Sequence, residues 1–588
     1  MCSDDYELLN ALGVVKGDKK LTTVYWRLLN LGPDGWTQTK NIQIVSICLA
    51  STTASAHMTA VIGGEPHLDP ALDACTSFGG SMRRFAHGIN LRLPGQDRHR
   101  LYYGALLLVS ADYPAAGQFC GTMESVSATH FCRHCYVAQQ HRTEVVNFLK
   151  GDLPFCRFRT HEAHLRDISD VKNGAVLPKG RGLHEWGTAL AEPYVLYARS
   201  VEIVPEDAMH DFFAGQLVAE MHVAFKCFAR NKKISFSRVS LNKAVAEWPS
   251  HETSDVPAVR PFKAKAFEGD PEEAKATRMR LTCAQVMHFA LILVPLLTGG
   301  DSPLLNLDEP DDVWTSLALH IKVISLCLKD RFSLVQVRHL QMVLLEQHIK
   351  LRETHPKLAK RHRFHFTLHI PQQILAFGPP RHYWCMRFEA KHQDIKALDS
   401  MLNFINLPKA VCRLASVIQA IEAHGDNRAR LMGPSLESTE DEFSIVSRFG
   451  ISPECTELTS TLESLCPQLR VGDLSAEGSI TSLGFAEFSG RRWKPHQHFI
   501  FCASGDGSGG EWIAARIEAL WFVSSVSELI FKVKFHSRVW TSKDAAGTSM
   551  VKLFASGEGF LLAADPSLRR VYVVPCASAS DVAWLLEL

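Results

Sequence analysis

A carboxylate at the end of an apolar stretch is the first group in this chain that could do chemistry. Residues 101–110 (LYYGALLLVS) are mostly apolar and β-favouring, and Asp112 follows them almost at once. This pattern predicts a buried strand with an acid at its mouth. Carboxylate oxygens bind Mg²⁺ or Mn²⁺, and a site at the edge of a sheet leaves room for substrate oxygens on the same metal. Asp-Tyr-Pro is also a good turn sequence, so for Asp112 alone the turn is the better interpretation.

Two cysteines downstream of Asp112 could hold a different metal. Cys132 and Cys135 form a C-x-x-C pair, and Asp207 and His210 form a D-x-x-H pair further along the chain. Thiolates at this spacing can bind one Zn²⁺, whose structural sites have four ligands. We therefore expect Cys132 and Cys135 to bind Zn²⁺ with His210 and one further ligand. The candidates for that further ligand are Asp207, His161 and His164.

A basic segment surrounds a further acidic signal, WCMRFEAKHQDIK, near Glu389. From residue 352 to 396 there are nine Lys or Arg residues against three acids, with six histidines besides. A charge run is usually a solvated face, but this one surrounds an acid on a predicted helix, which favours a surface that faces phosphate groups. Glu389, His392 and Lys396 lie on one face of that helix. Such a face is either a metal ligand with phosphate-binding neighbours or an ordinary salt-bridged surface.

The composition limits the class of protein. A chain of 588 residues is long enough for roughly two to four domains. Its 63 basic and 62 acidic residues leave a net charge of +1, so only a local patch could favour nucleic acid. Sixteen scattered cysteines and an N-terminal sequence without signal-peptide features indicate a reducing compartment. The longest apolar stretch, residues 286–297, is too short to span a bilayer, so we expect a soluble protein with no membrane partner.

The order of the predicted elements indicates an α/β fold. They are strands at 21–30, 41–50, 101–110 and 201–204, a helix at 73–90, helices from His210 onward, and a helical stretch at 284–353 broken by a loop at 299–310. The last helix of that stretch should start from a Ser333 cap. Residues 431–480 are acidic and rich in Ser, Thr and Pro, which is typical of a linker. Short β-rich runs beyond residue 491 predict a small antiparallel barrel or half-barrel.

Several motifs occur in an order that resembles a known family. They are DDYELLNALGVVKGDKKLTTVYWRLLNL, LLLVSADYPAAGQFCG followed by FCRHC, PEDAMHD, and FHFTLHIPQQILAFGPPRHYWCMRFEAKHQDIK. In patches between residues 1 and 423, the chain resembles transposases of the CACTA (En/Spm) DNA-transposon superfamily, in the version found as transposon-derived genes in animals and protists. The resemblance implies an RNase H-like mixed sheet with a DDE triad and a large helical insertion before the last acid. It also implies the C-x-x-C and D-x-x-H motifs between the second and third acids.

The same resemblance assigns residues to the chemistry. Asp4, Asp112 and Glu389 look like the catalytic acids that hold Mg²⁺ or Mn²⁺ for cleavage and transfer of DNA strands, a reaction that uses two metals about 3.5–4 Å apart. Independently of the resemblance, the apolar stripe of Phe388, Ile395 and Leu402 should lay its helix on the sheet and turn Glu389 toward the strand ends. The expected contacts to the DNA backbone are Arg361, Arg363, Arg387, Lys391, His392 and Lys396.

The expected organisation follows. Residues 1–210 form the first part of the RNase H-like core, 211–355 the helical insertion, 356–425 the last part of the core, 426–485 an acidic linker and 486–588 a small β-rich domain. DNA and a second copy of the chain are the expected partners, and the resemblance implies a nuclear location. Because Asp4 is so near the chain start, we expect its strand to fray and the enzyme to be truncated or decayed. The alternatives are a non-catalytic nuclear DNA- or chromatin-binding protein that keeps the scaffold, and a helical protein with an incidental zinc knuckle.

Overall fold

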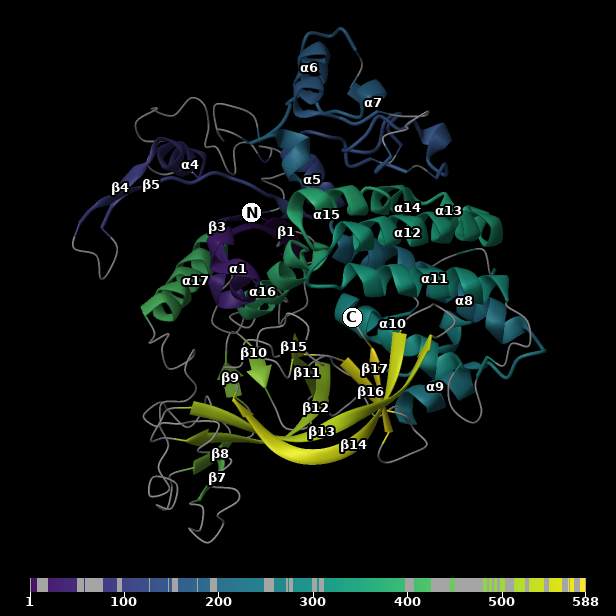
Figure 1. Ribbon diagram of the computed structural model, residues 1–588. Helices are drawn as coiled ribbons and strands as arrows, with labels where there is room; N and C mark the ends of the chain where they lie inside the picture. The colour runs from purple at the N-terminus through teal and green to yellow at the C-terminus, as the bar shows by residue number, and fades with distance from the viewer. Residues whose placement is uncertain are drawn as a thin grey trace. The chain divides into compact units, whose positions relative to one another are not determined.

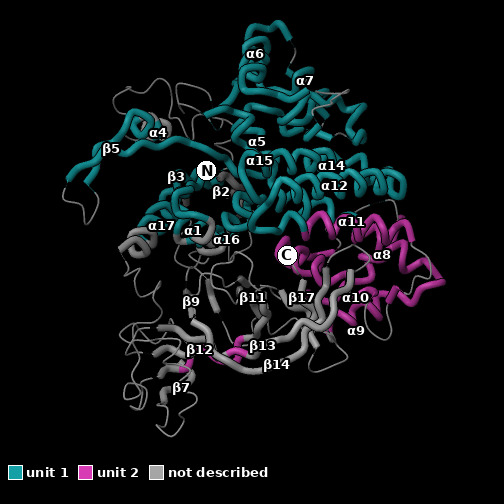
Figure 2. The backbone as a smooth tube through the Cα atoms, viewed as in Figure 1, with its two compact units in different colours: residues 1–220, 272–276, 326–422 teal, residues 221–271, 277–325, 423–588 magenta. Residues whose placement is uncertain are grey.

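The computed structural model of the chain (Figure 1) contains two compact units (Figure 2). The first comprises Met1–Glu220, Glu272–Ala276 and Leu326–Glu422, and the second Met221–Pro271, Thr277–Ser325 and Ala423–Leu588. The structure describes residues 2–7, 20–36, 38–49, 58, 78–92, 98–125, 127–145, 147–150, 157–176, 178–190, 198–247, 259–270, 273, 279–298, 304–305, 311–396, 407–424, 445–449, 480–483, 486–488, 491–493, 498–502, 512–523, 528–543, 549–562, 569–570, 572–575 and 582–586. The sites described below all lie in the first unit.

A four-stranded sheet organises the first unit. Its strands are β1 (Cys2–Glu7), β2 (Lys20–Trp26), β3 (Gln43–Leu49) and β6 (Ser110–Ala111), in the order β3-β2-β1-β6. β2 pairs antiparallel with both β1 and β3, whereas β6 runs parallel to β1. The sheet therefore contains both kinds of pairing, and the strand that carries Asp4 has a partner on each side. The strands predicted at 21–30 and 41–50 are confirmed as β2 and β3.

The buried strand predicted at 101–110 is wrong in its extent. Only its ends pair: β5 (Arg100–Tyr102) forms a ribbon with β4 (Ile89–Leu91), and β6 begins at Ser110. Leu101 and Leu107 are exposed, whereas Leu106 and Val109 are buried in the core cluster that includes Val24 of β2, so only part of this stretch faces the interior. The strand predicted at 201–204 is also wrong. This segment is the 3₁₀ turn η4 (Ser200–Ile203), held against the sheet by a hydrogen bond from Val109 N to the Ile203 carbonyl oxygen at 2.8 Å.

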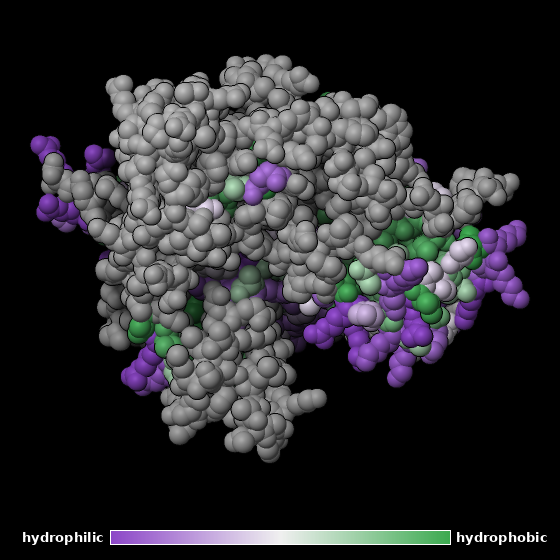
Figure 3. Space-filling model, turned by 90° about the horizontal axis from the view of Figure 1, so that it is seen from below, coloured by the Kyte–Doolittle hydropathy of each residue, from purple (hydrophilic) through white to green (hydrophobic). Residues whose placement is uncertain are grey.

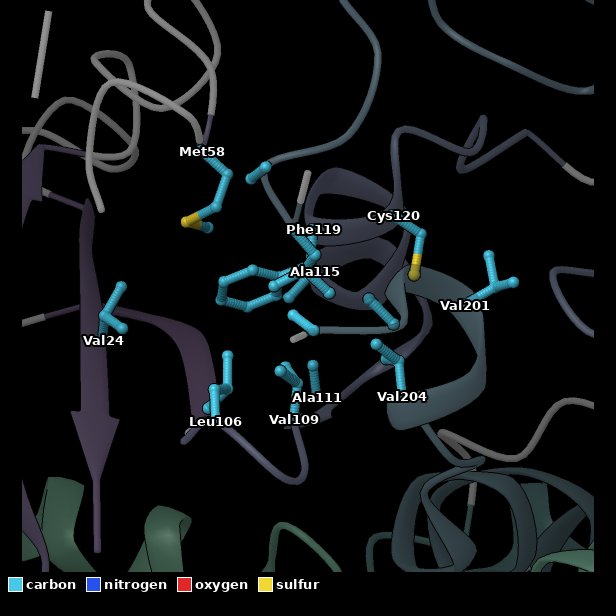
Figure 4. Close-up of a cluster of buried hydrophobic side chains, with 14 residues drawn as sticks. Val24, Met58, Leu106, Val109, Ala111, Ala115, Phe119, Cys120, Val201 and Val204 are labelled. Atoms are coloured by element: carbon cyan, nitrogen blue, oxygen red, sulfur yellow. The ribbon is translucent and has the colours of Figure 1, made fainter. Parts of the chain in front are cut away.

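A hydrophobic core fixes the start of α5 (Tyr113–Cys120), the helix that follows Asp112. Figure 4 shows side chains from β2, the end of β6, α5 and the η4 region gathered around Phe119. Phe119 and Ala111 are fully buried. The helix ends at Gly121, where φ is +71° and an added Cβ would lie only 2.0 Å from the Gly187 carbonyl oxygen, so only glycine fits. Both ends of α5 are thus fixed, and with them the position of Asp112.

The last helices of the first unit include one that packs on the sheet. They are α14 (His362–Thr367), α15 (Ile370–Phe377), α16 (Met386–Lys396) and α17 (Leu407–His424). The ring of Tyr25 on β2 lies 6.2 Å from that of Phe388 and 5.2 Å from that of His392, and α16 also contacts β1. Figure 1 shows α16 beside β1. The predicted packing of this helix on the sheet is confirmed at Phe388, while the side chain of Ile395 and the whole of Leu402 lie outside the described residues.

The helical block predicted after His210 is confirmed. It begins with the π-helical segment η5 (Met209–Gln216), which continues directly into α8 (Leu217–Arg230). The block continues with α9 (Arg238–Glu247), α10 (Cys283–Thr298), α11 (Asp312–Cys327), α12 (Leu334–Thr354) and α13 (Pro356–Ala359). Four further α-helices precede His210 in the described residues besides α5: α1 (Gly32–Trp36), α4 (Phe78–His87), α6 (His161–Lys172) and α7 (Pro178–Arg181). Ser333 caps α12 as predicted, in a capping box with Gln336.

The C-terminal region forms an antiparallel sheet. Its path runs β15-β11-β12-β13-β14-β17-β16, and β8 joins β12 and β7. Its strands are β7 (Ile445–Phe449), β8 (Ile480–Leu483), β11 (His498–Cys502), β12 (Trp512–Val523), β13 (Glu528–Lys543), β14 (Ser549–Leu562), β15 (Arg569–Arg570), β16 (Tyr572–Pro575) and β17 (Val582–Leu586). The short ribbon of β9 (Ala486–Phe488) and β10 (Arg491–Trp493) is separate. β7 and β8 fall inside the stretch expected to be a linker, so the β-rich region starts earlier than predicted.

The described residues show a mixed surface and short or polar helices. Seen from below, hydrophilic and hydrophobic side chains are mixed over the described residues (Figure 3). None of the helices that the structure describes is both long enough and apolar enough to cross a bilayer.

Candidate metal centre and acidic site

Two cysteines and two histidines from distant parts of the chain form a buried cluster. Cys132 and Cys135 lie in the segment after α5, His365 in α14, and His369 directly before α15. The Cys132 Sγ atom lies 3.4 Å from His369 Nε2, and Cys135 Sγ lies 3.2 Å from His365 Nε2. One ligand atom from each residue lies within 4.8 Å of the others, and all four residues are buried. The cluster therefore offers four converging donors.

The geometry of this cluster suits Zn²⁺. With usual Zn–S and Zn–N bond lengths at tetrahedral angles, a sulfur and a nitrogen ligand are separated by about 3.6 Å. The two observed separations, 3.2 and 3.4 Å, are close to that value. The backbone N–H of His134 also points at Cys132 Sγ, at 3.4 Å, which favours a thiolate. A closed set of two sulfur and two nitrogen donors can hold a metal ion such as Zn²⁺ and is typical of a structural site.

The electrostatics of the cluster also favour a thiolate. Burial opposes ionisation of Cys132, but the hydrogen bond with Cys135 and the neighbouring imidazoles of His369 and His365 outweigh it and hold the pKa of Cys132 well below its usual value. For His369 the effect of burial has the opposite direction: burial lowers the pKa of this imidazole and so favours its neutral, metal-binding form. Thiolate and neutral imidazole are the protonation states that a zinc site requires.

The histidines of this cluster differ from those that the sequence analysis proposed. His210, expected beside Cys132 and Cys135, lies instead in a second group with Asp207 and Cys385. The expectation for His210 is wrong because its two ring nitrogens both face carboxylates and neither faces the thiols. The remaining candidates are used elsewhere: His161 Nδ1 pairs with Ser200 Oγ at 3.1 Å, and His164 Nε2 pairs with the Cys120 carbonyl oxygen at 2.7 Å.

The sequence does contain a signal for the two histidines that were missed. His365 and His369 have the H-x-x-x-H spacing that often accompanies a C-x-x-C pair in zinc sites. They lie 230 residues or more beyond the cysteines that they meet, much further than in a local zinc finger. Only the fold brings such distant pairs together.

A second chain of contacts joins Asp207 to Glu389. His210 Nδ1 lies 2.5 Å from Asp207 Oδ2, and His210 Nε2 lies 3.1 Å from Glu389 Oε1. The other oxygen of Asp207 accepts the backbone N–H of Cys385, the residue just before α16, at 3.0 Å. Asp207 is buried, whereas Glu389 is partly exposed. One buried carboxylate therefore holds the start of α16 and, through His210, the Glu389 side chain.

The charges along this chain follow from its geometry. Both ring nitrogens of His210 face carboxylate oxygens, so both carry protons and the imidazole is cationic. Burial disfavours that cation, but Asp207 and Glu389 outweigh the burial and raise the pKa of His210 well above its ordinary value. Burial also opposes the charge on Asp207, yet the His210 ring and the Cys385 N–H hold its pKa below the usual range. Glu389 is thus paired with a cation of the protein itself.

A buried ion pair connects the Cys132 cluster to the turn that carries Asp207. Arg133, between the two cysteines, contacts the carboxylate of Glu206, the residue before Asp207. Its guanidinium also donates to the backbone carbonyl oxygens of Val204 and Pro205, at 3.3 and 2.9 Å. Both charged side chains are 1% exposed. The segment that carries the thiols and the turn that carries Asp207 are consequently held together.

The other two predicted acids are placed by the sheet. In the parallel pair of β1 and β6, Ser3 lies opposite Ala111, so the next positions along the two strands are Asp4 and Asp112. Asp112 Oδ1 accepts the backbone N–H of Ala115 at 2.9 Å, so Asp112 is the N-cap of the helix α5. The Asp4 side chain lies outside the described residues. Asp112 and Glu389 belong to neither of the two groups of converging metal-binding donors found among the described residues.

The basic surface expected around Glu389 is smaller than predicted. Lys391 and His392 are buried, because this part of α16 packs against the sheet. Arg363 is partly buried and donates to the His210 carbonyl oxygen at 2.6 Å. The two expected contacts that are exposed are Arg361 and Arg387, and the side chain of Lys396 lies outside the described residues.

Comparison with known proteins adds no family. The chain matches no protein-family model, and it matches no curated protein. What the site can do is therefore judged from its geometry: one closed sulfur and nitrogen cluster suited to a structural metal, one acid on β1, one directly after β6, and a third on the helix α16 that packs on this sheet.

Proposed function

We propose that the chain is a DDE-type transposase-like protein, in which Asp4, Asp112 and Glu389 serve metal-dependent cleavage and transfer of DNA strands. The observation that carries the proposal is the parallel register of β1 and β6, in which Asp4 on β1 corresponds to Asp112, the residue directly after β6. Carboxylates from different elements are what a two-metal site requires.

The arrangement around these acids supports the proposal. The strand order β3-β2-β1-β6, with β6 parallel to β1 and the other pairs antiparallel, is the order expected of an RNase H-like sheet. The helix α16, which carries Glu389, packs on β1 and β2 of that sheet. The segment between the second and third acids contains a long helical block, as expected of the insertion.

Each residue then has a role. Mg²⁺ or Mn²⁺ at the acids would activate a water molecule or a 3′-hydroxyl and stabilise the leaving oxygen. Asp207 holds the start of α16 through the Cys385 N–H, and His210 orients the Glu389 side chain. The Cys132 cluster, with Zn²⁺, ties the loop after Asp112 to the helices that precede α16. DNA, a second copy of the chain and a nuclear location remain part of the proposal.

One observation favours a second function, that of a non-catalytic DNA- or chromatin-binding protein with the same scaffold. Glu389 is paired with the cationic His210 at 3.1 Å, and Asp112 caps α5. Acids that are satisfied within the protein bind a divalent ion less readily than acids that repel one another. A chain of this kind would bind DNA without cutting it.

A strand-cleavage assay separates the two functions. The purified chain is incubated with duplex DNA and Mg²⁺ or Mn²⁺, beside Asp112→Asn, Glu389→Gln and the matched control Glu162→Gln on the exposed face of α6. The proposal predicts metal-dependent nicking that both site variants abolish and the control retains. DNA binding without nicking would favour the second function, and equal nicking by all four proteins would contradict both.

A further inference from the structure

A short arm between β3 and β6 carries most of its charge with one sign. From residue 83 to 103 the sequence has five arginines and two histidines but one acid, Asp97. The segment begins in α4 and continues into the β4–β5 ribbon, where Ile89 pairs with Tyr102 and Leu91 with Arg100.

The β4–β5 ribbon is attached to the end of α4. The N–H groups of Gly88 and Gly104 both donate to the Phe85 carbonyl oxygen, at 3.2 and 3.0 Å, which fastens the ribbon to the end of α4. Figure 1 shows β4 and β5 side by side next to α4. A two-stranded ribbon alone is marginally stable in water, so packing against α4 and a partner both matter to it.

The exposed side chains of the arm are basic and aromatic. Arg84 on α4, Arg98 shortly before β5 and Arg100 on β5 are exposed, and none of these three arginines has an ion pair with another described residue. Tyr103 is 68% exposed, and Leu101 is 52% exposed. A cluster of arginines without nearby described carboxylates attracts an anionic partner, and an open aromatic ring offers a stacking face.

We propose that this arm, α4 with the β4–β5 ribbon, contacts the phosphate backbone of duplex DNA. Guanidinium groups bind phosphate oxygens through two parallel hydrogen bonds, which suits arginine rather than lysine, and the arm has five arginines and no lysine. A two-stranded ribbon is also an element that the major groove of B-DNA can admit. Lys391 and His392 on α16 are buried and are not available to DNA, and the arginines of the arm provide exposed cations elsewhere in the same unit.

The inference rests on the proposed function for the identity of the partner, and its experiment needs no catalysis. Fluorescence anisotropy measures binding of the full chain to a labelled duplex of arbitrary sequence, without added divalent metal and without chelator, from about 50 to 200 mM salt. The test variant combines Arg84→Gln, Arg98→Gln and Arg100→Gln. Its control combines Lys150→Gln, Arg166→Gln and Lys172→Gln, three exposed cations of the first unit whose loss changes the net charge equally.

The slope of log affinity against log salt should become shallower by about 0.9 for each phosphate contact removed, so by roughly 1 to 3 in the arm variant, with little change in the control. Arg98→Gln alone should make the slope shallower by about 0.9. This single variant replaces the combined variant if the latter fails to fold. An unchanged slope in the arm variants would overturn the inference while the proposed function stays intact. The same change in the control would also overturn it. Binding of the same proteins to phosphatidylserine vesicles is measured in parallel. If the arm variant loses vesicle binding but keeps its DNA binding, the arm contacts a lipid surface and the inference is overturned. Failure of the unaltered chain to bind any duplex would instead contradict the proposed function.

Discussion

Replacement of Asp207 should loosen the helix that carries Glu389 more than any neighbouring change. The buried carboxylate accepts the Cys385 N–H at 3.0 Å and the Met209 N–H at 3.2 Å, and it balances the His210 imidazolium. Asp207→Ala leaves two buried backbone donors without their acceptor, and it leaves the largely buried His210 imidazolium with Glu389 alone as its counter-ion. Breaking a buried, hydrogen-bonded charge pair costs about 3–5 kcal/mol, and we expect a loss in that range. Asp207→Asn keeps an oxygen for the Cys385 N–H and should cost less, about 1–3 kcal/mol.

Hydrogen exchange followed by mass spectrometry suits this prediction, because it reports local opening in a chain with two units. Peptides that cover α16 should lose protection in the order wild type, Asp207→Asn, Asp207→Ala. The matched control is Asp170→Ala on α6, a partly exposed carboxylate with no side-chain hydrogen bond among the described residues, which should change stability by less than about 0.5 kcal/mol. Unchanged exchange of α16 in Asp207→Ala would refute the reasoning that this residue holds the helix.

Two further predictions concern the metal cluster and its link to Asp207. Native mass spectrometry should find one Zn²⁺ per chain, which Cys135→Ser and His369→Ala remove and Cys327→Ser, at a buried cysteine outside the cluster, retains; a zinc-free wild type, or loss of zinc in the control as well, would contradict the assigned ligands. Glu206→Ala should destabilise the first unit by about 3–5 kcal/mol in denaturant unfolding, since it removes the side-chain acceptor of the buried Arg133 guanidinium. A cost below about 1 kcal/mol would show that the backbone carbonyls alone satisfy Arg133.

The sequence predicts the regular elements well where a local pattern is enough. Alternating β-favouring residues identify β2 and β3, and the Ser333 cap with its apolar stripe identifies α12, because local propensity and packing agree there. The stretch at 101–110 misleads because an apolar run does not say what covers it. Leu101, in the β4–β5 ribbon, and Leu107 stay exposed, whereas Leu106 and Val109 pack into the core with Val24 of β2.

The candidate site was predictable only in part, for reasons of distance along the chain. Cys132 and Cys135 could be singled out because their spacing is local, whereas His365 and His369 join them only through the fold. His210 is predicted to join Cys132 and Cys135 but lies between Asp207 and Glu389 instead, since no spacing reveals that Glu389 lies within 3.1 Å of it. Lys391 was expected on the surface because charge suggests exposure, and contact of α16 with the sheet overrides that expectation.

The most direct measurement of the central claim is the position of a bound manganese ion. Crystals of the chain soaked in Mn²⁺ and measured at the manganese absorption edge would show whether one site takes ligands from both Asp112 and Glu389. We predict an anomalous peak in contact with both carboxylates and with Asp4, and with Glu389 turned away from His210. The same peak should be absent in Asp112→Asn. No peak at the acids, or a peak that reaches Glu389 but not Asp112, would contradict the assignment of these residues to one metal-dependent site.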